Sequence, residues 1–208
     1  MKKLAILIPV LIGMLTPLLA QPSITLLTFG SYTFPDKFDT EYGTGKVMDG
    51  FQWGGGLEFG LSDVTAVELI YQHLDTDAYY DGYYNLGSSE RFNGTVGINY
   101  LLLGATRYAP INEKVSGFGT LDMGVGWFNP SSSLESEGTT KFSIGGRLGV
   151  RIQTSERVSL RLHAQVISPV QWAGGGFYFG TGGSGAGVST GSTIWQFNLG
   201  GSLNFKLR

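Results

Sequence analysis

The sequence has 208 residues, a formal net charge of −2 and no cysteine. A slightly acidic chain offers nucleic acid no basic surface, so we expect no nucleic-acid partner. The absence of cysteine excludes a small fold held together by disulfides. Charged residues make up only 14% of the chain, against about 25% in soluble domains, and glycine contributes 33 residues.

Residues 1–20 have the layout of a bacterial secretory signal peptide. Lys2 and Lys3 precede an apolar run that ends at the small residue Ala20. Prolines and a glycine interrupt the run, which argues against a membrane-spanning helix. We therefore expect a signal peptide at 1–20 and one exported domain at 21–208. No later apolar run reaches the ~20 residues of a spanning helix, so any membrane crossing must use strands.

Eight segments of the exported domain alternate between apolar and polar residues, which is the period of a β-strand with one apolar face. In the last of them, Trp195, Phe197 and Leu199 alternate with Gln196 and Asn198. No helical period and no linker interrupts the series, so we expect one all-β domain. The predicted strands cover 24–34, 51–61, 64–74, 92–104, 115–128, 140–152, 157–168 and 193–206.

The connections between these segments alternate between short and long. The short, turn-rich ones are 62–63, 109–113 and 154–156, whereas the longer polar or glycine-rich ones are 35–50, 75–91, 129–139 and 169–192. Short turns at one end and long loops at the other are typical of a meander. The sequence therefore predicts an eight-stranded antiparallel up-and-down β-barrel.

The composition of the polar face decides which side of this barrel faces outward. That face consists mostly of Gly, Ser, Gln and Asn with a few charges. Glycine on a solvated strand face would weaken the strand and pack against nothing. In a narrow barrel, by contrast, small inward residues make room for long ones that fill the lumen. We therefore predict that the apolar face meets lipid and that closure removes the sheet edges that hydrocarbon would not tolerate.

The charges on the polar face come from opposite arcs of the predicted barrel. The acidic residues lie on the second, third and fifth strands, and the basic residues lie on the sixth and seventh. Buried charges are costly unless they are paired and hydrogen-bonded, so we predict a charged network that closes the lumen. Its members are Glu58, Glu68, Asp122, Arg147, Arg151, Arg161 and His163.

Aromatic residues near the ends of the apolar faces are expected to form girdles at the two membrane interfaces. In the segment 92–104 we place Asn99 on the polar, inward face. The predicted interface residues are Trp53, Phe59, Tyr100, Trp127, Phe142, Trp195 and Phe205.

These features, together with the last strand TIWQFNLGGSLNFKL, resemble the small outer-membrane barrel family, which includes the OmpA-type transmembrane domain and the OmpX-like and opacity-like proteins. The resemblance covers essentially all of 21–208 and implies the bacterial outer membrane, with short periplasmic turns and long extracellular loops. The sequence ends with the last strand, so we expect no peptidoglycan-binding domain. Barrels of this kind usually end on an aromatic residue, whereas here Lys206, Leu207 and Arg208 follow Phe205.

Members of such families serve as structural, adhesive or partner-binding barrels, and some form narrow pores. We therefore expect a structural or binding barrel with a closed lumen, with a narrow pore for water or small solutes as the alternative. The expected partners are outer-membrane lipid and an extracellular ligand or protein within a larger outer-membrane assembly. The candidate binding residues in the loops are Tyr79, Tyr80, Tyr83, Tyr84, Phe177 and Tyr178.

A third reading, an enzyme that modifies outer-membrane lipid, would need a nucleophile, a base and an orienting acid together. His73 has Asp75 on its own face but no serine, and Ser159 stands four residues from His163. We therefore expect no enzyme, no cofactor and no metal. The acidic, tyrosine-rich loop does not have EF-hand spacing, and the last glycine-rich loop lacks the ending of a phosphate-binding P-loop.

Overall fold

The computed structural model describes residues 23–40, 43–82, 91–130, 139–169, 175–180, 183–188 and 195–207. The predicted signal peptide at 1–20 lies outside these residues. Among the residues described, no helix is long and apolar enough to cross a bilayer.

All the elements in the described residues are β-strands, and each of the eight predicted strands is present. The strands that form the barrel wall are β1 (Ser23–Thr33), β4 (Gly50–Ser62), β5 (Thr65–Gly82), β6 (Arg91–Pro110), β7 (Val115–Pro130), β8 (Thr139–Gln153), β9 (Val158–Pro169) and β12 (Gln196–Lys206). Four shorter strands form two hairpins, β2 (Asp36–Thr40) with β3 (Gly43–Val47) and β10 (Gly175–Gly180) with β11 (Gly183–Val188).

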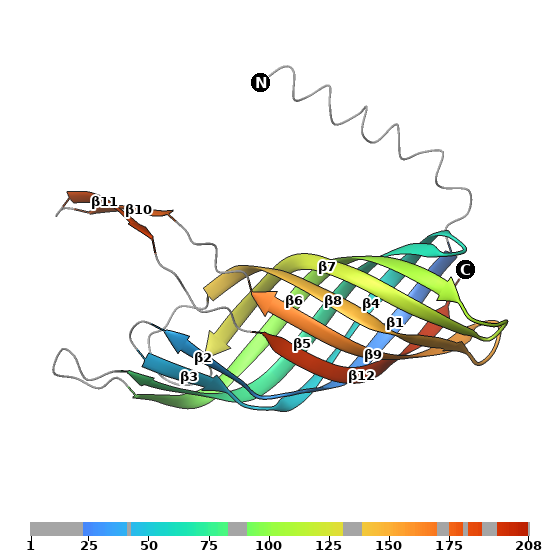
Figure 1. Ribbon diagram of the computed structural model, residues 1–208, viewed down its shortest axis with the longest axis horizontal. Helices are drawn as coiled ribbons and strands as arrows, with labels where there is room; N and C mark the ends of the chain where they lie inside the picture. Colours follow the sequence, from blue (N-terminus) through green and yellow to red (C-terminus); the bar gives the residue numbers. More distant parts are fainter. Residues whose placement is uncertain are drawn as a thin grey trace, which may run out of the picture.

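The eight long strands form a closed antiparallel ring (Figure 1). Each strand pairs with the next in the chain, and β1 closes the ring by pairing with β12 from Thr25↔Lys206 to Thr33↔Asn198. The hairpin β2–β3 extends the wall at the long-loop end, where β3 pairs with β5. Every strand of the ring has a partner on both sides, so the ring has no edge strand whose backbone N–H and C=O groups would need water as a partner.

The strands β5 and β6 are longer than predicted. The segment 75–91 was expected to be a loop, but the two strands stay paired as far as Asp81↔Arg91. Tyrosine and threonine favour strands, and cross-strand pairs such as Tyr79↔Asn93 continue the ladder. The loops predicted at 35–50 and 169–192 likewise contain the two hairpins. Polarity alone therefore did not separate loop from strand beyond the apolar part of the barrel.

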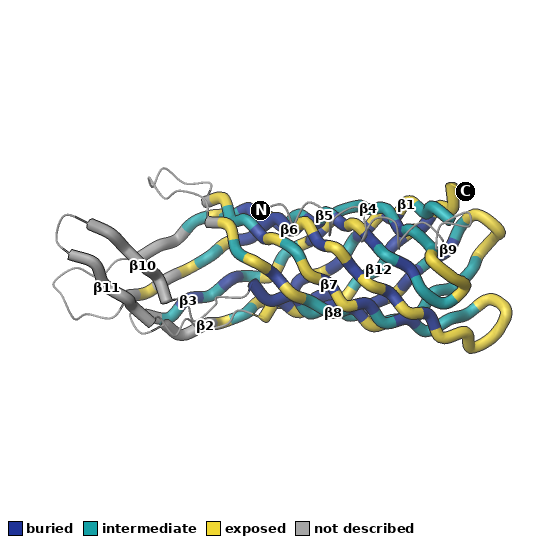
Figure 2. Tube along the Cα trace, turned by 90° about the horizontal axis from the view of Figure 1, so that it is seen from above, coloured by how far each residue is buried: buried dark blue, intermediate teal, exposed yellow. Residues whose placement is uncertain are grey.

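Buried and exposed positions alternate along the wall strands (Figure 2), and the exposed side chains are largely apolar whereas many of the buried ones are polar or charged. Leu121 and Leu148 are 75% and 71% exposed, whereas Arg147 and Arg161 are each 1% exposed. A water-soluble domain would bury the leucines and expose the arginines. The exposed apolar residues of the wall include Leu26, Trp53, Leu69, Leu101, Leu103, Met123, Val125, Ile144, Leu162, Leu199 and Leu203.

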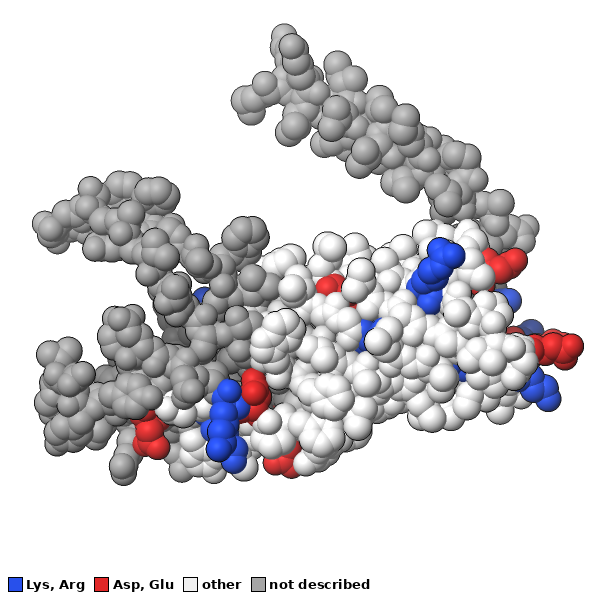
Figure 3. Space-filling view, viewed as in Figure 1, with Lys and Arg blue, Asp and Glu red and all other residues white. Residues whose placement is uncertain are grey.

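The apolar outer surface extends far enough along the strands to cross the hydrocarbon core of a membrane. On β6 the outward side chains between Asn99 and Arg107 carry no charge, and on β5 the same holds between Thr65 and His73. A transmembrane strand needs about 9–11 tilted residues to cross the hydrocarbon. Figure 3 shows one face of the barrel, on which charged side chains concentrate toward the two ends. The outward surface is therefore a hydrocarbon-facing belt between two polar rims.

One segment has the opposite phase to the prediction. Tyr100, expected at the lipid interface, is 0% exposed and its hydroxyl donates a hydrogen bond inside the barrel to Gln196 Oε1 at 2.5 Å. Asn99, expected inside, lies on the outward side of β6. The reason is that both faces of this segment are apolar, with Ile98 and Leu102 inward and Leu101 outward. Polarity therefore could not fix which face was which.

Candidate functional site

Two buried arginines and three carboxylates form a layer of ion pairs across the lumen. Arg147 on β8 places its Nη2 atom 2.7 Å from Glu68 Oε2 and 3.0 Å from Asp122 Oδ1, and its Nε donates to Asp122 Oδ2 at 3.0 Å. Arg161 on β9 donates from Nη1 to Glu68 Oε1 at 2.8 Å and from Nη2 to Glu58 Oε2. Glu68 is thus shared by both guanidinium groups.

The strand register brings these charges to one level. Glu58 pairs with Glu68 across β4 and β5, and Gly104 lies between Glu68 and Asp122 on β6. A Cβ atom added at Gly104 would lie 2.6 Å from Asp122 Oδ1 and 3.3 Å from Arg147 Nη2. Glycine at this position therefore makes the space into which the arginine reaches. Two carboxylates on adjacent strands are tolerable only because the guanidinium groups stand between them.

Aromatic rings support the layer from the side of the short turns. The Tyr108 hydroxyl donates to Glu58 Oε2 at 2.5 Å, and the Arg161 guanidinium lies 5.2 Å from the ring centre of Phe118. Arg147 lies 5.4 Å from the ring centre of Phe29. Cation–π contacts of this kind attract the guanidinium groups and help to hold their orientation. Tyr108 and Phe118 were not predicted from the sequence, because bulky aromatic residues were expected to face lipid.

Two residues of the predicted network lie beside the ion pairs rather than in them. Arg151 is half-buried and stacks over Tyr108, with its Cζ atom 4.4 Å from the ring centre. His163 is buried and meets the ring of Phe29 edge-on at 6.0 Å. The buried Nε2 atom of His163 has no hydrogen-bond partner in the described residues.

A second layer, closer to the long loops, fills the lumen with amides and apolar side chains. Gln72 and Gln165 face each other across the barrel, with Gln72 Nε2 donating to Gln165 Oε1 at 3.2 Å. Beyond them lies an apolar cluster that includes Leu74 and Ile98, both at most 3% exposed. Its buried members are Val47, Leu74, Ile98, Tyr100, Leu102 and Ile167. Val47 comes from the hairpin strand β3, so the hairpin also contributes to the filling of the barrel.

No protein-family profile and no curated protein matches the sequence. Solved structures do match. The crystal structure of Neisserial surface protein A aligns with a TM-score of 0.58 at 11% identity, over 88% of this chain and 97% of that one. The outer membrane protein OprG from Pseudomonas aeruginosa aligns with a TM-score of 0.55 at 12% identity, over 89% of this chain and 97% of that one.

The chain has the fold of the small eight-stranded outer-membrane barrels. Such a barrel, with an apolar belt outside and polar groups inside, is a structure for the bacterial outer membrane. Its short turns face the periplasm and its longer loops face the outside of the cell.

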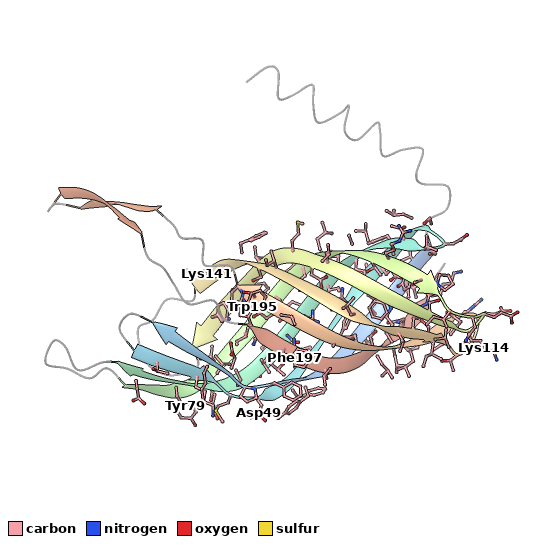
Figure 4. The ribbon with its side chains drawn as sticks, in the orientation of Figure 1. Asp49, Tyr79, Lys114, Lys141, Trp195 and Phe197 are labelled. Atoms are coloured by element: carbon pink, nitrogen blue, oxygen red, sulfur yellow. The ribbon has the colours of Figure 1, made fainter. Side chains whose placement is uncertain are left out.

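The outer-membrane barrel carries aromatic residues at both edges of the belt. Trp53, Phe142, Trp195 and Phe205 point outward and are between 39% and 56% exposed. Trp127 and Phe59 point outward but are partly covered, and the ring centre of Trp127 lies 6.1 Å from that of Tyr71. Of the predicted interface residues, Tyr100 is therefore the one that the structure places elsewhere. Figure 4 labels Trp195, which directly precedes β12, and Phe197, which lies near the start of that strand.

A polar cluster that the sequence did not reveal lies on the outer surface beside Trp53. Asn99 Oδ1 accepts a hydrogen bond from the Tyr71 hydroxyl at 2.7 Å and lies 2.8 Å from His73 Nδ1. His73 Nε2 in turn lies 3.1 Å from Asp75 Oδ2, and its ring packs against Trp53. These polar groups satisfy one another at the edge of the belt, where the hydrocarbon gives way to headgroups.

The extracellular rim contains one of the predicted loop residues among those described. Tyr79 is 40% exposed and, with Asp49, Asp75, Asp77 and Thr95 among others, lines a hollow of about 290 Å³. Figure 4 shows Tyr79 and Asp49 at the end of the barrel opposite Lys114. The side chains of Tyr80, Tyr83, Tyr84, Phe177 and Tyr178 lie outside the described residues.

In the same rim the Tyr32 hydroxyl donates to Asp49 Oδ2 at 2.5 Å, which holds the pKa of the Asp49 carboxyl below its usual value. Within the ranges that the structure describes, no group of three or more His, Cys, Asp or Glu side chains could hold a metal ion.

Proposed function

We propose that the protein is a non-enzymatic barrel of the outer membrane whose lumen is sealed and whose role, structural or in binding, is performed by its outward surfaces. The observation that carries this proposal is the ion-pair layer. Arg147 and Arg161 are each 1% exposed and reach across to Glu58, Glu68 and Asp122.

A permeating ion would have to separate these pairs. Removing one partner of a buried ion pair costs about 3–5 kcal/mol of stability, because the other charge is left uncompensated. The apolar cluster around Leu74 and Ile98 lies farther toward the long loops and would have to be hydrated as well. Two unlike barriers in series therefore support a lumen that does not conduct.

The extracellular end offers the surface for binding. The strands β5 and β6 have 18 and 20 residues, well beyond the about 9–11 that cross the hydrocarbon. They lift the hairpin β2–β3 and the hollow beside Tyr79 above the apolar belt. A rigid, paired platform holds side chains in place with little loss of entropy on binding, which favours contact with a partner.

Non-enzymatic character is supported by the surroundings of the two histidines. In the described part of the chain, His73 is bonded to Asn99 and Asp75, and neither histidine is hydrogen-bonded to a serine or threonine hydroxyl. A nucleophile, a base and an orienting acid are thus not assembled around either ring.

A narrow water pore is the second candidate, and one observation favours it. Several buried polar atoms of the lumen have no partner among the described residues, including Gln52 Nε2, Gln196 Nε2 and both side-chain atoms of Asn198. Buried polar groups are usually hydrogen-bonded, so water is the natural partner for these atoms. Such water would lie above the ion pairs and would need a path past them to be conducted.

Planar-bilayer recording separates the two candidates. We expect the purified protein, inserted into a planar bilayer, to give no steady single-channel steps, because the ion pairs and the apolar cluster both block the lumen. Steady steps in the wild-type protein that change in size in the Glu58→Gln variant would show that the lumen conducts. Tyr79→Ser, which lies at the outer rim, serves as the matched variant that leaves the lumen intact.

A further inference from the structure

The periplasmic mouth of the barrel is hollow, although the lumen above it is filled. A cavity of about 730 Å³ lies at the short-turn end. Its lining residues are Ser23, Thr25, Glu58, Arg151, Gln153, Glu156, Arg157, Ser159, Lys206 and Leu207. An adjoining hollow of about 370 Å³ shares Ser23, Glu58, Arg151 and Lys206 with it. The volume is that of a small-molecule site, since ligand pockets commonly enclose about 300–1,000 Å³.

The cavity ends blindly at the ion-pair layer. Glu58 lines both hollows and Tyr108 lines the smaller one, and the two are bonded to each other, since Tyr108 donates to Glu58, which is also paired with Arg161. This end of the cavity is therefore fixed. A molecule that enters from the periplasm meets a wall of satisfied groups and goes no further.

Three basic side chains converge on this cavity from different parts of the wall. Arg151 projects from β8, Arg157 from the turn before β9, and Lys206 from the end of β12. In the described residues none of the three forms an ion pair, and the contact made by Arg151 is the stacking of its guanidinium on the Tyr108 ring. Stacking holds the plane of a guanidinium while leaving its N–H groups free to donate.

The acidic residues of the cavity do not cancel this charge. The Oε2 atom of Glu58 is paired with Arg161 and accepts a hydrogen bond from the Tyr108 hydroxyl, so the charge of this carboxylate is shared with a cation outside the cavity. Glu156 is exposed in the turn, as are Arg157 beside it and Lys206 at the end of β12. The Ser159 hydroxyl is a neutral donor beside Arg151 in the wall, whereas the Gln153 side-chain amide already donates to the Ser155 carbonyl at 2.6 Å. The larger cavity therefore has three basic side chains against two carboxylates, an excess of one positive charge, while the adjoining hollow is balanced, with Arg151 and Lys206 against Glu58 and Asp63.

We propose that this mouth is a binding site for a small soluble anion of the periplasm that carries carboxylate or phosphate groups. Guanidinium groups bind both kinds of group in a bidentate, charge-assisted manner. The site is distinct from the extracellular surface of the proposed function and does not depend on it, since it opens to the opposite side of the membrane.

Titration of the protein in zwitterionic detergent micelles at constant ionic strength tests the site. The probes are citrate and inorganic phosphate, with glucose as the neutral control, and binding is followed by the NMR amide shifts of Arg151, Arg157 and Ser159. We expect saturable shifts with citrate or phosphate and none with glucose. Arg151→Gln should weaken binding by about tenfold or more, because it removes a charge-assisted contact.

Arg107→Gln is the matched control, since Arg107 lies on the outer wall at the same end. It should change the affinity by less than about twofold, the effect of a rim charge screened by salt. Arg157→Gln is the second variant in case Arg151→Gln fails to fold, which is checked by heat-dependent gel mobility. Equal weakening by Arg107→Gln and Arg151→Gln, or shifts that never saturate, would overturn the proposal. So would a site that responds only when phosphatidylglycerol is added to the micelles, because the ligand would then be lipid.

Discussion

Replacement of Arg147 by alanine is expected to destabilise the barrel by about 3–5 kcal/mol. Arg147 is the cation that contacts Asp122 in the described residues, through Nε and Nη2. Glu68 keeps Arg161 after the change, but Asp122 is left buried with no positive partner. An uncompensated buried charge is among the most destabilising changes known for a single position. The free energy of unfolding is measured by urea titration of the protein folded into lipid vesicles.

Double substitution distinguishes the ion pair from the packing around it. The variant Arg147→Met with Asp122→Leu removes both charges and keeps most of the volume, so it should be more stable than Arg147→Ala alone. Arg107→Ala on the outer wall should change stability by no more than about 0.5 kcal/mol. A loss of less than about 1 kcal/mol in Arg147→Ala would be that of a solvent-exposed ion pair. It would show that water reaches the ion-pair layer in the lumen.

An arginine in place of Leu103 is expected to destabilise the barrel in lipid by about 2–4 kcal/mol. Leu103 is 52% exposed on β6, and its cross-strand neighbours Leu69 and Met123 are exposed and apolar as well. It stands midway between the polar groups Asn99 and Arg107, where a charge is furthest from either interface. Unfolding in vesicles gives the stability difference.

Ile111→Arg is the matched control for this substitution. Ile111 is 66% exposed but lies in the short turn between β6 and β7, outside the belt, so its replacement should change stability by no more than about 0.5 kcal/mol. In a water-soluble barrel both substitutions would be equally harmless, because both side chains would face water. Equal effects of the two would therefore remove the basis for a lipid-facing belt.

The sequence predicted the fold well where one strand face carried charge. Around Arg147 and Arg161, one face of the strand carries only polar residues or glycine and includes charges, whereas the other is apolar, so the phase of β8 and β9 was determined. The phase failed around Tyr100, where both faces of β6 are apolar. Which carboxylate meets which arginine also could not be read from the sequence, because it depends on the register of strands far apart in the chain.

The extent of the strands was predicted less well than their number. Beyond the belt, β5 and β6 continue through polar residues such as Asp77 and Thr95, where Thr95 Oγ1 donates to Asp77 Oδ1 at 2.9 Å. Pairing there depends on cross-strand partners and not on apolar alternation. The cavity at the periplasmic mouth depends on three basic residues that the sequence scatters over 151, 157 and 206, so no local pattern could have indicated it.

A single-cysteine scan along β12 tests most directly whether the barrel is apolar outside and polar inside. The chain has no native cysteine, so each position can carry one nitroxide spin label in the protein inserted into vesicles. The structure predicts that collision with lipid-soluble oxygen peaks at the outward positions Phe197, Leu199, Leu203 and Phe205. It predicts low collision rates at the inward positions Asn198, Ser202 and Asn204, which are at most 3% exposed. Oxygen collision rates that peak at the inward positions, or water-soluble nickel reagents that reach the outward ones, would show that the apolar face does not meet lipid.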